Sequence, residues 1–357
     1  MKQINITTPS KNYPVYIGEQ AITKLGSVLQ SLTPVPKNVL IITDHNVGEL
    51  YLKDVQAELH QAFSYEIFQI KPGDSQKSFE NYYACQSFAL EKGLDRTSVI
   101  LALGGGMIGD IAGFVAGTYM RGIRFIQLPT TILAHDSAVG GKTGINHPEG
   151  KNMIGVFHQP EAVIYSTDFL STLPENEIRS GFAEVIKHAL IADPTFYEYL
   201  HGNIKTLDDL KNEHLLNCLT RGIEIKNEVV SQDEREKGIR AFLNFGHTLG
   251  HAIEGEFQYR GITHGEAVAH GMLFALSLKD ENRQLRKDLK KWLNDLGYSP
   301  IPKNLSVQSL INRMKKDKKA AGGTIHMVLL EELGHPYLAS YQAIDLEEKL
   351  TAFLKEN

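Results

Sequence analysis

Cysteine is scarce in this sequence, and its scarcity excludes several kinds of site. Cys85 and Cys218 are the two cysteines among 357 residues, and they form neither a Cys-x-x-Cys pair nor a disulfide framework. The N-terminal stretch lacks the apolar core of a signal peptide, and no apolar run approaches the roughly 20 residues of a membrane span. We therefore expect a cytoplasmic protein without a membrane partner.

An excess of positive charge is also missing. The formal net charge is -5, which argues against generic binding to nucleic acid. Hydrophobic residues make up 42% of the chain and charged residues 22%, as in ordinary soluble globular proteins. A chain of this length can bury a large core, and it indicates two domains.

The first half of the sequence alternates strand-like and helix-like segments. Short apolar runs occupy residues 39–43, 98–103, 125–129 and 162–165, and helical segments such as residues 79–92 lie between them. This pattern predicts a Rossmann-like, mostly parallel sheet that is covered on both faces. In such sheets, ligands bind beyond the carboxyl ends of the strands.

Helical periodicity dominates the second half. We predict helices at residues 174–188, 215–230, 243–257, 266–285 and 286–296, with one strand at 325–330. The chain is therefore divided into an α/β nucleotide-binding domain, residues 1–172, and an essentially all-α domain for metal and substrate, residues 173–357. The lysine-rich run at residues 315–319 is expected to be a solvated face.

Two histidines, His247 and His251, are four residues apart and share one face of a predicted helix. Imidazole pairs at this spacing are good ligands for a divalent transition metal, and His264 supplies a third imidazole. The alternative is a pair of ordinary surface or core histidines, which are common at this spacing.

A glycine-rich turn at residues 104–110, GGGMIGD, follows a predicted strand and precedes a helix. It matches G-x-G-x-x-G, in which glycines let backbone N–H groups approach a pyrophosphate. In the usual fingerprint, an acid follows about 20 residues later. Here Arg121 and Arg124 lie in that stretch, and no acid occurs before Asp136. Asp44, at the end of an earlier strand, is a suitable acid. The alternative is a tight strand–helix turn without a ligand.

Polar residues in glycine-rich loops indicate anion binding. Lys142 and Lys151 lie beside glycines, close in sequence to Asp136 and Asn152, and such loops suit phosphate or carboxylate. Gly-Gly-Lys-Thr is not a P-loop, because the spacing would require glycine at Asp136.

Glu184 and Lys187 share a helical face. They are either a surface ion pair or a buried pair in which a metal neutralises Glu184. Further donors are supplied by Lys226, Arg240 and Asn244.

Taken together, these segments resemble the 3-dehydroquinate synthases of the sugar phosphate cyclase superfamily. The landmarks are GGGMIGD, RGIRFIQLPTT, DSAVGGKTGIN, GKNMIG, FLSTLP, GFAEVIKHALI, DEREKGIRAFLNFGHTLGHAIE, HGEAVAHGM and KKDKKAAGG, in consistent order through nearly the whole chain. The resemblance implies an N-terminal α/β nucleotide domain and a C-terminal helical domain. It also implies a cytoplasmic homodimer with a small-molecule substrate, a phosphorylated sugar acid.

The resemblance further implies roles for individual residues. Metal ligands for Zn²⁺ or Co²⁺ would be Glu184, His247 and His264. NAD⁺ would be held by Asp44, Asp74, Lys77, Gly105, Gly106, Met107, Ile108, Gly109, Asp110, Thr130, Thr131, Lys142, Lys151, Phe169, Leu170, Ser171 and Thr172. Catalytic residues that also contact substrate would be Asp136, Lys142, Lys187, Lys226, Arg240, Asn244 and His251, with Arg121, Asn152 and Lys318 as further substrate contacts. Arg121 would reach the phosphate site from a neighbouring subunit.

The implied activity is that of a lyase of the shikimate pathway of aromatic amino acid biosynthesis. 3-Deoxy-D-arabino-heptulosonate 7-phosphate would be oxidised transiently by NAD⁺, lose phosphate, be reduced, open and close to a carbocycle. His251 would serve proton transfer beside the metal, and Asn244, one turn before His247, would share its helical face.

Two departures from the family pattern occur in the first domain. Asp74 stands where the family usually has glutamate, and the segment between Thr131 and Asp136 is one residue shorter than the commonest form.

Rival interpretations are a cyclase for sedoheptulose 7-phosphate, a metal-dependent alcohol dehydrogenase that releases NADH, and a non-catalytic binding module.

Overall fold

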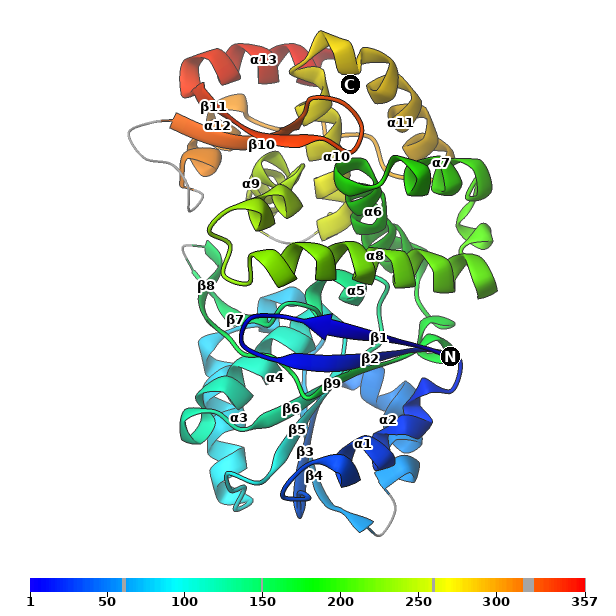
Figure 1. The fold of residues 1–357 in the computed structure, drawn as a ribbon. Helices are drawn as coiled ribbons and strands as arrows, with labels where there is room; N and C mark the ends of the chain where they lie inside the picture. The colour runs from blue at the N-terminus through cyan, green and yellow to red at the C-terminus, as the bar shows by residue number, and fades with distance from the viewer. Residues whose placement is uncertain (60–61, 149, 259–260, 317–323, 357) are drawn as a thin grey trace. The chain divides into compact units, whose positions relative to one another are not determined.

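The computed structural model describes residues 1–59, 62–148, 150–258, 261–316 and 324–356. The chain divides into two compact units (Figure 1). The first unit comprises Met1–Leu173 and Lys226–Arg235, and the second comprises Pro174–Ile225 and Glu236–Asn357.

The first unit is built on a seven-stranded sheet in the order β1-β2-β9-β6-β5-β3-β4. All neighbours are parallel except β1 and β2. The four predicted strands are confirmed as β3 (Asn38–Asp44), β5 (Val99–Gly104), β6 (Arg124–Pro129) and β9 (Ala162–Ser166). The sequence analysis missed β1 (Lys2–Thr7), β2 (Asn12–Gly18) and β4 (Ser64–Ile70), which lie towards the edges and lack a continuous buried run.

Helices cover both faces of this sheet (Figure 1). Val39 and Ile41 of β3 pack with α1 (Leu25–Ser31) and α2 (His45–Leu59) on one face. The short η1 (Ala21–Lys24) directly precedes α1 and belongs to the same cluster. The alternate residues Leu40 and Ile42 pack with α3 (Phe79–Glu91) and α4 (Gly106–Thr118) on the other face. Burial on both sides explains why these strands are uninterrupted apolar runs.

Strands β3 and β5 are neighbours in the sheet, but the chain continues from β3 to β4 on one side and from β5 to β6 on the other. This is a topological switch point, where the loops beyond the carboxyl ends of the strands diverge and leave room for a ligand. The described residues of this unit also form four short segments and a hairpin: η3 (Asp74–Gln76), η4 (Tyr119–Arg121), α5 (Ala134–Ser137), η5 (Thr167–Leu170), and β7 (Lys142–His147) with β8 (Gly150–Phe157).

Residues 226–235, which the sequence analysis placed in the second domain, belong to the first unit. They comprise the last turns of α8 (Asn212–Gln232) and the following loop. Asn227 Oδ1 accepts the N–H of Thr7 at 2.9 Å, and Glu234 accepts the N–H of Ser10 at 3.2 Å and the side-chain amide of Gln159 at 2.7 Å. These polar contacts explain the difference, because sequence periodicity alone does not reveal them.

The second unit is mainly helical. Its helices are α6 (Glu175–Ala192), α7 (Pro194–Asn203), the first part of α8, α9 (His247–Glu256), α10 (His264–Ser277), α11 (Arg283–Asp295), α12 (Val307–Lys316) and α13 (Ala343–Glu356), with short turns η6 (Leu207–Asp209), η7 (Ile239–Asn244) and η8 (Asp280–Asn282). The prediction of a single helix at residues 266–285 was wrong, because α10 ends at Ser277 and η8 separates it from α11.

The second unit also contains a hairpin of β10 (Thr324–Leu330) and β11 (Pro336–Gln342). The sequence analysis predicted β10, which is largely buried. It missed β11, which begins with proline and alternates between half-buried and exposed residues.

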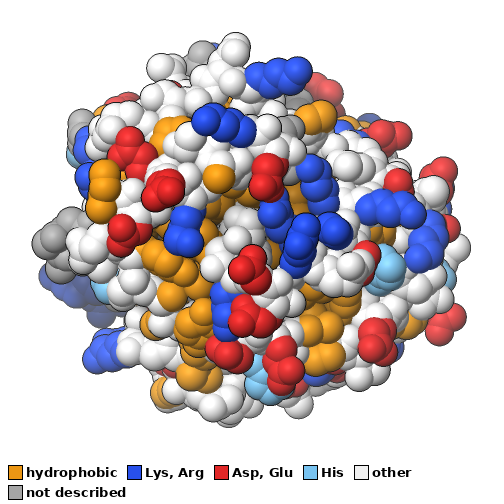
Figure 2. Space-filling model, turned by 90° about the horizontal axis from the view of Figure 1, so that it is seen from above, with side chains coloured by type: hydrophobic (Ala, Val, Ile, Leu, Met, Phe, Trp, Pro, Cys, Tyr) orange, Lys and Arg blue, Asp and Glu red, His pale blue; other side chains and the backbone are white. Residues whose placement is uncertain are grey.

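Figure 2 shows one face of the molecule, on which acidic and basic side chains are interspersed around hydrophobic ones. Within the described ranges, no helix is both long and apolar enough to cross a membrane.

Candidate functional site

The glycine turn of the first unit joins β5 to α4 at the carboxyl edge of the sheet. A Cβ at Gly105 would lie 2.8 Å from Thr131 Cγ2, and one at Gly109 would lie 2.8 Å from Gln127 Oε1. Close packing therefore accounts for glycine at both positions. Helix α4 begins at Gly106 and its N-cap is Gly105, which has no side chain to cap it. The first N–H groups of α4 can therefore bind an anion.

Asp44 ends β3 at the same edge and precedes α2. It is 8% exposed, and its Oδ1 accepts the N–H of Val47 at 3.1 Å, so it caps α2. Among the described residues, the buried hydroxyls of Thr130 and Thr131 lack a hydrogen-bond partner. Buried polar atoms of this kind are candidates for ligand contacts.

The predicted segment 169–172 follows β9 at this edge. The Phe169 ring lies 4.5 Å from that of Tyr51, centroid to centroid, and the Tyr51 hydroxyl contacts Thr172 Oγ1 at 2.5 Å. Leu170 is buried and Ser171 is exposed. Tyr51, on α2, was not among the predicted site residues.

Five predicted residues form one polar network in the first unit. Lys77 Nζ contacts Asp110 Oδ2 at 2.6 Å and donates to Asn152 Oδ1, and Lys151 Nζ lies 3.2 Å from Asp74 Oδ2. Burial raises the pKa of Asp110, and Lys77 opposes that shift. The sequence analysis missed Asn146, whose side-chain amide donates to Asp74 Oδ2 at 3.2 Å.

Asp136 and Lys226 are also brought together in the first unit. Lys226 Nζ lies 3.1 Å from Asp136 Oδ1 and donates to the Asp136 carbonyl. Lys142 begins β7 and is exposed.

Two of the predicted substrate contacts are not placed with this group. Arg121 is exposed at the end of η4 (Tyr119–Arg121), shortly before β6, and therefore lies near the amino edge of the sheet rather than the carboxyl edge. Lys318 lies outside the described residues.

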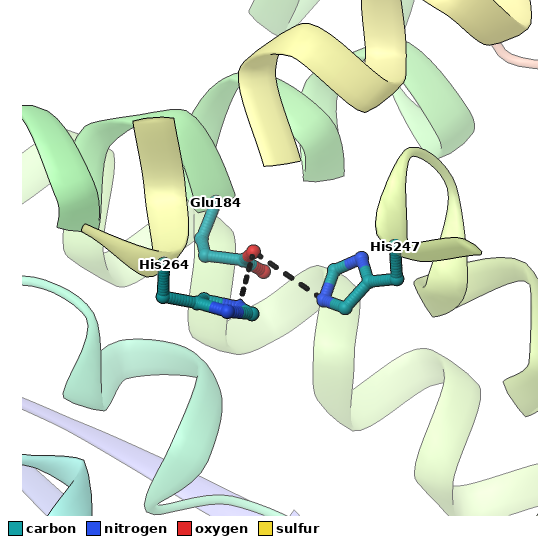
Figure 3. Close-up of side chains that lie close together, drawn as sticks. All are labelled: Glu184, His247 and His264. Atoms are coloured by element: carbon teal, nitrogen blue, oxygen red, sulfur yellow. Dashed lines mark ion pairs between the residues drawn. The ribbon is translucent and has the colours of Figure 1, made fainter. Parts of the chain in front are cut away.

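The second unit brings Glu184, His247 and His264 together from three helices. Glu184 lies within α6, whereas His247 and His264 are the first residues of α9 and α10. Nε2 of each histidine lies 3.5 Å from Glu184 Oε1, as Figure 3 shows, and all three ligand atoms lie within 4.8 Å of one another. A carboxylate and two imidazoles converging in this way can hold Zn²⁺ or a similar ion.

The second nitrogen of each imidazole is anchored. His247 Nδ1 lies 3.1 Å from the Phe245 carbonyl oxygen, and His264 Nδ1 lies 3.0 Å from Glu254 Oε2. Histidines that bind metals almost always donate their other N–H to such an acceptor. Glu254 was not among the predicted site residues, because only its three-dimensional contact with His264 identifies it.

The two histidines have opposite pKa shifts. Burial lowers the pKa of His247 well below its usual value, and Lys187 adds to the effect. Burial also lowers the pKa of His264, but Glu254 and Glu184 outweigh it and raise that pKa to about 9. Opposite pKa shifts around a buried carboxylate, Glu184, are typical of a functional site.

Lys187 and His251 flank the cluster. Lys187 Nζ donates to Glu184 Oε2, and both side chains are 1% exposed, so the pair is buried rather than on the surface. The His251 ring lies 5.2 Å from that of His247 and 5.9 Å from that of His264. His251 is thus beside the candidate ligands, one helical turn from His247.

The predicted position of Asn244 was wrong. The α-helix does not begin at residue 243, since Asn244 ends η7 and Gly246, with φ 79°, separates it from α9. Asn244 therefore does not share a helical face with His247. Its amide donates to Glu236 Oε1 at 2.7 Å, and Glu236 was also missed. Arg240, in η7, is 1% exposed.

The whole chain is similar to known 3-dehydroquinate synthases. Family models described as 3-dehydroquinate synthase N-terminal and C-terminal match residues 67–180 and 181–320. The curated 3-dehydroquinate synthase of Bacillus cytotoxicus is 54% identical over 100% of this chain and 97% of its own length. The 3-dehydroquinate synthase of Bacillus cereus is 52% identical over 100% of this chain and 99% of its own length.

Solved structures share the fold. A 2-deoxy-scyllo-inosose synthase, complexed with carbaglucose-6-phosphate, NAD⁺ and Co²⁺, has a TM-score of 0.89 and 26% identity over 98% of this chain and 99% of that one. An iron-containing alcohol dehydrogenase has a TM-score of 0.73 at 17% identity, over 99% and 98%, which shows likeness of fold alone. The family models and the full-length curated relatives agree, and the chain belongs to the 3-dehydroquinate synthase family.

Proposed function

We propose that this chain converts 3-deoxy-D-arabino-heptulosonate 7-phosphate to 3-dehydroquinate and phosphate. The observation that carries the proposal is the convergence of Glu184, His247 and His264 in a chain that matches curated 3-dehydroquinate synthases over its whole length. The shikimate pathway is the corresponding place in metabolism.

We assign the metal, Zn²⁺ or Co²⁺, to Glu184, His247 and His264. The donor set fits, because each Nδ1 faces an acceptor and each Nε2 faces Glu184 Oε1. When bound, the metal supplies a Lewis acid for hydroxyl oxygens of the substrate. The related cyclase structure that holds Co²⁺ and NAD⁺ supports both cofactors for this chain.

NAD⁺ is assigned to the carboxyl edge of the first-unit sheet, where it would supply a hydride acceptor that is restored within each turnover. The N-terminus of α4 would bind the pyrophosphate, and Asp44 the ribose. Thr130, Thr131, Asp74, Lys77, Lys151 and residues 169–172 are the further candidate contacts.

Candidate substrate contacts are assigned residue by residue. Lys187, Arg240 and Asn244 of the second unit, and Lys142, Asn152 and Lys226 of the first, offer donors for phosphate and carboxylate. Asp136, which faces Lys226, orients that ammonium. His251 would accept the proton of the C5 hydroxyl during oxidation. Holding the charged groups of a substrate in fixed positions lets an enzyme catalyse several steps in succession.

A homodimer is part of the proposal. Arg121 is exposed near the amino edge of its own sheet, away from the carboxyl edge to which NAD⁺ is assigned. This position supports the assignment of Arg121 to the phosphate site of a neighbouring subunit. We also assign the enzyme to the cytoplasm, as the family resemblance implies.

The test is an assay of the purified chain with the heptulosonate phosphate, Zn²⁺ and a trace of NAD⁺. We expect phosphate and 3-dehydroquinate to form in equal amounts, without accumulation of NADH. Stoichiometric NADH would instead identify an alcohol dehydrogenase. Turnover of sedoheptulose 7-phosphate in place of the acid would identify a different cyclase.

A further inference from the structure

Glu254 is a buried carboxylate on the helix that also carries His247. Its side chain is 2% exposed, and it lies seven residues after His247 on α9. Seven residues are about two helical turns, so both side chains are on the same side of the helix. Helix α9 therefore presents one candidate ligand and the carboxylate that contacts the other.

The His264 ring lies between two carboxylates. Its Nδ1 is 3.0 Å from Glu254 Oε2, and its Nε2 is 3.5 Å from Glu184 Oε1. A histidine that binds a metal does so in its neutral form, because the metal displaces one ring proton, and this form has one N–H and one lone pair. When Nδ1–H is donated to Glu254, the lone pair remains on Nε2 and faces the Glu184 side, where the metal would lie.

The two histidines differ in what holds them. His247 Nδ1 faces a backbone carbonyl, which is neutral, whereas His264 Nδ1 faces a carboxylate. Burying a carboxylate costs several kcal/mol unless it is paired, so filling space does not account for Glu254. A carboxylate on the far nitrogen makes an imidazole a more basic ligand and fixes its orientation.

The backbone of His264 is fixed separately. Thr263 and Glu266 form a capping box at the start of α10, and the Ser180 hydroxyl accepts the N–H of Gly265 at 3.0 Å. These contacts fix the main chain but leave the ring free to rotate about its side-chain bonds. The contact between His264 Nδ1 and Glu254 Oε2 restrains that rotation.

We propose that Glu254 is a positioning residue that orients His264 and strengthens metal binding at Glu184, His247 and His264. The inference rests on the metal site of the proposed function and adds a residue that the family resemblance did not supply.

The test measures the affinity of metal-free protein for Zn²⁺ and Co²⁺ by competition with a chromophoric chelator. Glu254→Gln keeps the size of the side chain and Glu254→Ala removes it. Glu256→Gln is the matched control, because Glu256 lies on the same helix but pairs with Arg313 at 3.0 Å. We expect affinity to fall about tenfold in Glu254→Gln and about 100-fold in Glu254→Ala, and to change less than about twofold in Glu256→Gln.

Thermal unfolding of the metal-free proteins identifies variants that remain folded, and the Co²⁺ absorption spectrum reports the geometry of the site. If Glu254→Ala does not fold, Glu254→Gln decides. A folded Glu254 variant with wild-type affinity and an unchanged Co²⁺ spectrum overturns the proposal. By contrast, wild-type protein that binds metal through His247 but releases no phosphate overturns the proposed function and leaves the role of Glu254 intact.

Discussion

Gly271 and Gly246 are in close backbone contact. A Cβ placed at Gly271 would lie 1.8 Å from the Gly246 carbonyl oxygen. Gly246 has φ 79° and immediately precedes His247, the first residue of α9. The middle of α10 is thus packed against the turn that starts α9, and this contact sets where His247 begins its helix.

The first prediction concerns Gly271→Ala. The added methyl group cannot fit without displacing the Gly246 turn, because the obstacle is backbone and not a flexible side chain. We expect a loss of stability at or above the upper end of the usual overpacking range of about 1–3 kcal/mol, together with weaker metal binding. Urea unfolding and metal content are the measurements.

Gly202→Ala is the control for this prediction. Gly202 lies in α7, and no described atom comes within 4 Å of a Cβ built there. The substitution should be neutral or stabilise the protein by about 0.5 kcal/mol. Equal destabilisation by both substitutions would contradict the steric explanation.

A second prediction concerns the two thiols. Cys85 and Cys218 are buried, and burial raises the pKa of both to about 12. At pH 8 the thiolate fraction is then about 10⁻⁴, so Ellman's reagent should modify neither thiol in the native protein and both in guanidinium chloride. Rapid labelling of the native protein at pH 8 would contradict the burial of these residues.

The sequence predicted the central strands well because both of their faces are buried. Residues such as Leu40 and Ile41 belong to opposite cores, which leaves a continuous apolar run in the sequence. Strand β11, with alternating exposure, left no comparable run.

Within the site, the ligand types could be predicted but their supports could not. The residue pattern indicated His247, His251 and His264 as candidate ligands and a metal beside Glu184, and the family resemblance selected Glu184, His247 and His264 from these. Glu254 acts only through a three-dimensional contact with His264, which no spacing rule encodes. The sequence pattern predicted one continuous helix through Asn244 and His247. In the structure, Gly246 with its positive φ interrupts that helix, so Asn244 does not share a helical face with His247.

A third prediction is that His264→Ala abolishes metal-dependent turnover while the chain stays folded. His264 is partly exposed and contributes one of three candidate ligands, so its removal should affect the site more than the core. Bound metal, measured by elemental analysis, should fall with the activity. Full activity at normal metal content would exclude His264 as a ligand.

A fourth prediction concerns Arg240, which is 1% exposed. Arg240→Ala should lower kcat/KM for the phosphorylated substrate by about 10- to 100-fold, the range for a lost hydrogen bond to a charged group. NAD⁺ affinity should not change. Arg240→Lys keeps the charge without the two-pronged geometry and should recover part of the loss, whereas unchanged kinetics in Arg240→Ala would reject the role.

The fifth prediction separates two roles of Asp44. Its Oδ1 caps α2 through the N–H of Val47, and its charge is assigned to the ribose of NAD⁺. Asparagine caps helices as well as aspartate, so Asp44→Asn should unfold at nearly the wild-type urea concentration. Its KM for NAD⁺ should nevertheless rise about tenfold, equivalent to about 1.4 kcal/mol.

Asp44→Ala removes both functions and should lose about 1 kcal/mol of stability in addition. The two variants together distinguish a cap from a cofactor contact, because each role predicts a different pair of changes. If Asp44→Asn leaves the KM for NAD⁺ unchanged while Asp44→Ala is merely less stable, Asp44 is a cap alone, and the ribose must be bound elsewhere at the carboxyl edge of the sheet.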